Sequence, residues 1–75
     1  MGGERGGGGV TRDDAVATLR ASVHWTRDEY AERRAEAVAA FRVFWASNPT
    51  EEEFSRTMSL VILAPEMLYL MVAHP

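Results

Sequence analysis

Three threonines in this chain are each followed, three residues later, by an acidic residue and then by apolar residues at helical spacing. A threonine hydroxyl ahead of a helix accepts a hydrogen bond from the backbone N–H of the third helical residue, and an acid there reaches back to the threonine N–H. The acid also lies in the first turn, where the helix dipole favours negative charge. The pattern therefore predicts a small all-α domain whose helix starts are set locally. The three pairs are Thr11 with Asp14, Thr26 with Glu29, and Thr50 with Glu53.

The length of 75 residues limits the chain to one domain. A domain of this size buries only about 60% of the surface that its unfolded chain exposes, so its stability is marginal. The sequence has no cysteine, so neither a disulfide nor a thiolate metal site can add to that stability. A second copy or a bound partner is the remaining common source of stability.

The first ten residues differ in composition from the rest. Residues 1–10 are mostly glycine, which loses more backbone entropy on ordering than any other residue. We expect a flexible Gly-rich tail there, followed by a single helical domain over residues 11–75.

Apolar spacing and helix-breaking residues predict four helices. No Gly or Pro interrupts residues 12–47, so the spacing also permits one long helix there; we expect a break near residues 24–26. Pro49 pushes the residue before it out of the helical region and ends the second helix. Pro65 suits the first position of a fourth helix. The predicted helices cover residues 12–25, 27–47, 51–63 and 65–73.

The predicted fold is a compact bundle of three to four short helices. The large apolar residues recur every three or four positions, which places them on helix faces that can pack together. We expect the core to consist of Val16, Leu19, Val23, Tyr30, Val38, Phe41, Trp45, Phe54, Met58, Val61, Ile62 and Leu68.

No set of residues completes a catalytic, cofactor or metal site in the sequence. The absence of lysine excludes a Schiff base and the lysine of a phosphate-binding loop. His24 and Asp28 have metal-ligand spacing but no third ligand, and a helix end near residue 25 separates them. Glu51, Glu52 and Glu53 point in three directions from a helix, so we interpret them as a solvated first turn. We predict no catalytic residue, no metal ligand and no cofactor.

The second half of the chain has more large apolar side chains than so short a polypeptide can bury alone. The end of the second predicted helix is apolar almost all round, and the fourth has little polar surface. A helix that is apolar on every side is normally buried. We therefore expect a homodimer, or a tight complex with another protein, through these two segments. The predicted partner-binding residues are Phe44, Trp45, Met67, Leu70 and Met71.

The leading functional hypothesis is a small non-enzymatic interaction module, such as an adaptor, inhibitor or assembly factor, that self-associates through an apolar helical surface. The first alternative is a helix-turn-helix DNA-binding regulator, although three glutamates at residues 51–53 would begin the reading helix and meet phosphates. The second is a peripheral membrane protein. The apolar run at residues 58–73 is shorter than the about 20 residues of a membrane span, and the charges near it are acidic.

Composition also bears on origin and location. All basic residues are arginine and glutamine is absent, which indicates a GC-rich genome such as that of an actinobacterium or one of its phages. The Gly-rich start has no apolar stretch of the kind found in secretory signals. We therefore expect a cytoplasmic location.

Overall fold

The computed structural model describes residues 10–73, in which four α-helices and no strands are found. The all-α prediction is confirmed. Residues 1–9 of the predicted flexible tail lie outside the described residues. The helices are α1 (Arg12–Ser22), α2 (Arg27–Ala46), α3 (Glu51–Met58) and α4 (Pro65–Ala73).

All three predicted threonine caps are present. In α2 the Glu29 N–H donates to the Thr26 hydroxyl at 3.1 Å, and the Thr26 N–H donates to the Glu29 carboxylate at 2.8 Å. The same reciprocal pair starts α3, with distances of 3.1 and 3.0 Å between Thr50 and Glu53. At α1 the Thr11 hydroxyl accepts from the backbone N–H of the third helical residue at 3.1 Å. These caps satisfy backbone donors that a helix start would otherwise leave unpaired.

A turn at residues 23–26 separates α1 from α2, so the single long helix is excluded. The last turn tightens through bonds between residues three apart: the His24 N–H donates to the Ala21 carbonyl and the Trp25 N–H to the Ser22 carbonyl. Thr26 then adopts an extended backbone. The first helix therefore ends at Ser22, three residues before the predicted end.

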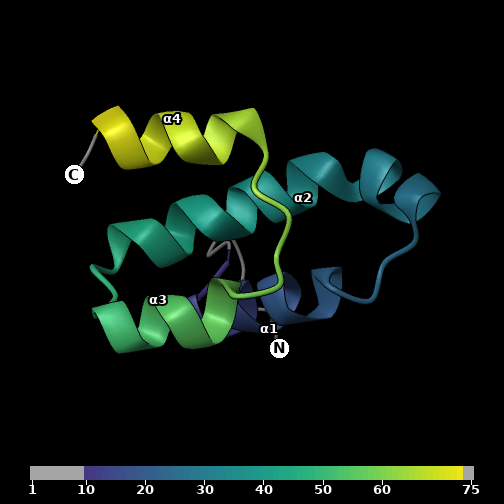
Figure 1. Ribbon diagram of the computed structural model, residues 1–75. Helices are drawn as coiled ribbons and strands as arrows, with labels where there is room; N and C mark the ends of the chain where they lie inside the picture. The colour runs from purple at the N-terminus through teal and green to yellow at the C-terminus, as the bar shows by residue number, and fades with distance from the viewer. Residues whose placement is uncertain (1–9, 74–75) are drawn as a thin grey trace, which may run out of the picture.

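The third helix ends at Met58, five residues before the predicted Leu63. Its continuation is a linker, residues 59–64, that crosses α2 on its way from α3 to α4 (Figure 1). The Tyr30 hydroxyl of α2 donates to the Ile62 carbonyl at 3.1 Å and fixes the linker halfway. An unbroken helix over residues 51–63 could not make this crossing.

Helix α2 occupies the centre of the fold, between α4 on one side and the α1–α3 pair on the other (Figure 1). The buried core lies where these helices meet, and an aromatic cluster closes its end: Phe41 stacks on Trp45 with ring centroids 5.9 Å apart, and Trp45 meets the edge of Phe54 at 5.9 Å. The buried apolar side chains are Ala15, Leu19, Ala37, Val38, Ala40, Phe41, Phe44, Met58, Val61, Ala64 and Met67.

Two residues of the predicted core are on the surface. Ile62 is 64% exposed and Leu68 is 47% exposed, so this part of the core prediction is wrong. Ile62 lies in the linker rather than on a helix facing the core, and Leu68 lies on the side of α4 away from α2. Their places are taken by Phe44 and Met67, which are both fully buried.

Candidate interaction surface

The structure divides the predicted partner-binding residues into core and surface. Phe44 and Met67 are fully buried within one copy, so neither side chain lies on the molecular surface. Trp45, Leu70 and Met71 are half-buried and pack against the core with one side.

The three half-buried residues do not form one site. Trp45 and Met71 line a hollow at the corner of α2 and α3, together with Pro49 and Phe54. Leu70 instead lines a groove on another side of α4. The predicted site is therefore split by α4, whose two flanks open onto different depressions.

Six large apolar side chains in the linker and α4 are exposed, and we call them the apolar surface. Leu60 is 76% exposed, Tyr69 is 71% and Val72 is 79%, so these three project almost entirely into solvent. These six residues lie close together along the chain, and large exposed apolar patches are uncommon on monomeric proteins. The members are Leu60, Ile62, Leu63, Leu68, Tyr69 and Val72.

The apolar surface follows from how α4 is placed. Its backbone approaches that of α2 but neither α1 nor α3. Met67, Leu70 and Met71, spaced three and four residues apart, face α2 and fill the contact. Leu68 and Val72, four residues apart, lie on the remaining side and are 47% and 79% exposed. Because α4 is apolar on both sides and has one neighbour, half of its apolar residues stay in water.

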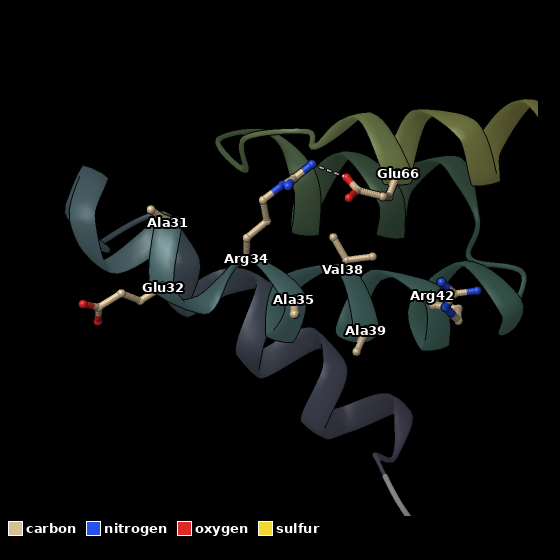
Figure 2. A pocket seen from close by; sticks show the side chains of 8 residues that line it. All are labelled: Ala31, Glu32, Arg34, Ala35, Val38, Ala39, Arg42 and Glu66. Atoms are coloured by element: carbon tan, nitrogen blue, oxygen red, sulfur yellow. Dashed lines mark hydrogen bonds and ion pairs between the residues drawn. The ribbon is translucent and has the colours of Figure 1, made fainter.

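A groove runs along α2 on the side that faces neither α1 nor the core. Its floor consists of Ala31, Ala35 and Ala39, one residue per turn, and Val38 closes it toward α4. Figure 2 shows Ala35 and Ala39 pointing away from α4 while Val38 points toward it. Next to it, Tyr69 and Leu70 of α4 line a second depression; Arg42 and Glu66 line both, which makes the groove continuous with one flank of α4.

Charged residues stand at both ends of this groove. Arg34 donates to Glu66 at 2.6 Å and ties α2 to the start of α4 (Figure 2). Glu32 and Arg42, at opposite ends of the alanine row, are both exposed. Neither has an ion pair with any residue in the part of the chain that the structure describes. The groove therefore carries one uncompensated negative and one uncompensated positive charge.

Within residues 10–73, two titratable groups have shifted pKa values, and both make contacts that hold the fold. The backbone N–H of Thr50, helped by the Arg12 guanidinium 3.0 Å away, lowers the pKa of Glu53. Burial raises the pKa of Tyr30, with Arg34 opposing that shift and Glu66 adding to it. Neither group lies in the apolar surface, so these shifts indicate structural contacts between helices.

The described residues can also be searched for a metal site and for a membrane-spanning helix. Within residues 10–73, no three histidine or carboxylate side chains gather as metal ligands would. His24 lies in the turn after α1 and Asp28 lies in α2, so the two share no helix face. None of the four described helices combines the length and apolar content that crossing a membrane requires.

The predicted partner-binding residues include none of the six side chains of the apolar surface. The predicted third helix, residues 51–63, contains Leu60, Ile62 and Leu63. In the structure all three lie in the linker and are exposed. The available signal was the unbroken apolar run before Pro65, which no single helix face can bury. A comparison of the chain with protein-family models, curated proteins and solved structures found no match.

Proposed function

We propose that this protein is a small non-enzymatic interaction module that binds another protein through the apolar surface of the linker and α4, and that it also self-associates. An adaptor, an inhibitor or an assembly factor would act in this way. The observation that carries the proposal is the exposure of the six large apolar side chains on a domain that has few such residues to spare. A cytoplasmic location and an actinobacterial or phage origin belong to the same proposal and rest on composition alone.

The energetics support a protein partner. Covering one large apolar side chain contributes about 1.5–3 kcal/mol, so the apolar surface has enough side chains to support specific binding. Leu68 and Val72 are four residues apart on a helix, which is the spacing of anchors that enter a groove or meet another helix. Tyr69 adds an aromatic ring with a hydroxyl, a residue type enriched at interfaces.

The charges favour protein over nucleic acid or lipid. The apolar surface is next to Glu66, and the first turn of α3 carries Glu51, Glu52 and Glu53. Phosphates of DNA would be repelled by α3 if it were the reading helix. A helix that lies on an anionic membrane usually has arginine or lysine on its polar face, and α4 has neither.

Site-specific photo-crosslinking tests the proposal. A photoreactive amino acid replaces Val72, which is 79% exposed, and the full chain is expressed in its native host. The control places the same group at Ala17, an exposed position on α1. We expect a crosslinked protein of defined mass from position 72 that is absent from position 17 and that disappears when Leu68→Ser is added. Crosslinking to lipid alone, or equal products from both positions, would contradict the proposal.

A further inference from the structure

Four of the residues that line the groove on α2 are placed symmetrically about Ala37. Ala35 and Ala39 lie two residues on either side of Ala37, and Glu32 and Arg42 lie five residues on either side. At 1.5 Å rise per residue the two charges are about 15 Å apart along the helix. At 100° per residue they fall on opposite edges of the face whose middle is the Ala35–Ala39 row. A half-turn about that midpoint therefore exchanges the negative end with the positive end.

We propose that two copies of this chain pair through this groove, with their α2 helices antiparallel and with Glu32 of each copy against Arg42 of the other. The inference rests on the self-association in the proposed function and names its interface, which does not include Leu68 and Val72 of the apolar surface. A two-fold interface uses the same patch on both copies, so the patch must be complementary to itself. The exchange of Glu32 with Arg42 and of Ala35 with Ala39 meets that condition in the middle of the groove.

The small side chains on the groove floor permit the close approach that the ion pairs need. Axes of packed helices lie about 8–10 Å apart, with the lower value where the contact residues are small. Ala31, Ala35 and Ala39 are all exposed, so nothing in the described chain prevents a second helix from reaching this distance. The side chains of Glu32 and Arg42 are long enough to meet across such a contact from their opposite edges.

The charges on α2 favour a second copy over a neutral covering. Asp28 and Glu32 are four residues apart on the helix, where like charges repel. Neither is ion-paired within residues 10–73, and the same is true of Arg42. An antiparallel copy brings a cation to the acidic half of the groove and an acid to its basic half. Both uncompensated ends are then satisfied at once.

The same two-fold axis also covers part of α4. An axis perpendicular to the paired α2 helices carries both α4 helices to one side of the dimer, so their groove-side flanks face each other. That flank presents Tyr69 and Leu70, which line the depression continuous with the groove. Leu68 and Val72 lie on the other side of α4 and stay available to a different protein.

Charge reversal with complementary mixing tests this arrangement. The samples are the wild-type full chain, Glu32→Arg, Arg42→Glu and an equimolar mixture of the two variants, each followed by sedimentation over a concentration series. We expect a wild-type dimer. Each variant alone places like charges together twice and should dissociate about tenfold to 100-fold more readily. The mixture restores both attractive pairs, so a 1:1 heterodimer should recover.

Two controls exclude unfolding and a general effect of charge as the cause. Glu32→Arg creates favourable pairs with Asp28 and Glu36 at four-residue spacing, so circular dichroism should show an intact helix. Arg20→Glu reverses an exposed cation on α1, outside the groove, and should leave the dimer unchanged. Failure of the mixture to pair, a wild-type chain that stays monomeric, or a dimer insensitive to both reversals would overturn the inference. A dimer sensitive to Leu68→Ser and not to the reversals would overturn it while supporting the proposed function.

Discussion

At the scale of single residues, the arginine at the start of α1 connects three helices. The Arg12 guanidinium pairs with Glu53 at 3.0 Å and donates to the Ser47 hydroxyl at 3.0 Å. It also lies over the ring of Phe44, 5.7 Å from the centroid. The Glu53 carboxylate also accepts from the Thr50 N–H and so caps α3. These contacts join the start of α1, the end of α2 and the start of α3.

This network makes stability depend on pH through Glu53. Its pKa is lowered in the folded protein from the ordinary 4.5, first by the Thr50 N–H and then by Arg12. A lowered folded-state pKa gives a stabilisation that is fully present above about pH 4.5 and is lost as pH falls through the folded value. Glu53→Gln cannot titrate, so its melting temperature should fall less steeply than that of the wild type from pH 5 to about pH 3.

The matched control for this titration is Glu51→Gln, which removes a carboxylate from the same first turn without breaking an ion pair or the cap. Melting temperatures of the three proteins, measured by circular dichroism across the same pH range, give the comparison. Parallel curves for the wild type and Glu53→Gln would mean that Glu53 carries none of the acid sensitivity.

At the scale of helices, α4 is held against the fold by a single neighbour, because its backbone approaches only α2. Met67 is the single α4 side chain with no exposure, and it anchors the contact. Met67→Ala should cost about 2–5 kcal/mol through lost burial and the cavity left behind. Hydrogen exchange should show the loss of protection concentrated in α4 and its linker, with α1 and α2 less affected. Met71→Ala, at a half-buried position, is the control and should cost less; equal loss over all helices would show one cooperative unit instead.

The starts of the helices could be predicted from the sequence more accurately than the end of α3. A start depends on local chemistry, as at Thr26 and Thr50, so it could be predicted from four consecutive residues. The end of α3 depends on where the chain must go next, because the linker has to pass α2 before α4 can begin. The turn after α2 shows the local case again: Asn48 adopts a left-handed backbone with φ of 56°, a conformation that asparagine tolerates after a helix, and Pro49 follows.

Periodicity could not sort the side chains of α4 into core and surface for the same reason. Its sequence is apolar on both sides, so Met67 and Leu68 were equally good candidates for burial until the position of α2 was known. As a result, Met67 is buried in the core where Leu68 was expected. Phe44 is also buried, although it was expected on the surface. The excess of apolar residues in the second half was readable from composition, whereas the residues that remain exposed are set by tertiary placement.

At the scale of the whole molecule, the groove on α2 and the apolar surface of the linker and α4 should affect stability and association in different ways. In the proposed dimer, the groove face stabilises the protein only when two copies meet, so the melting temperature should rise with protein concentration. Val72 contributes little to the folding of one copy because it is 79% exposed, whereas Leu68, at 47% exposed, contributes more. Substitutions at positions as exposed as Val72 usually change stability by no more than about 0.5 kcal/mol.

The double variant Leu68→Ser/Val72→Ser separates these two demands. Its melting temperature should be slightly below that of the wild type and should rise with concentration in the same way, while its binding of an apolar fluorescent dye should fall sharply. Glu32→Arg should do the reverse, keeping the dye signal and losing the concentration dependence. Scanning calorimetry at several concentrations, with dye fluorescence on the same samples, measures both properties. A serine variant whose melting temperature no longer rises with concentration would place the self-contact on α4 rather than on the alanine row of α2.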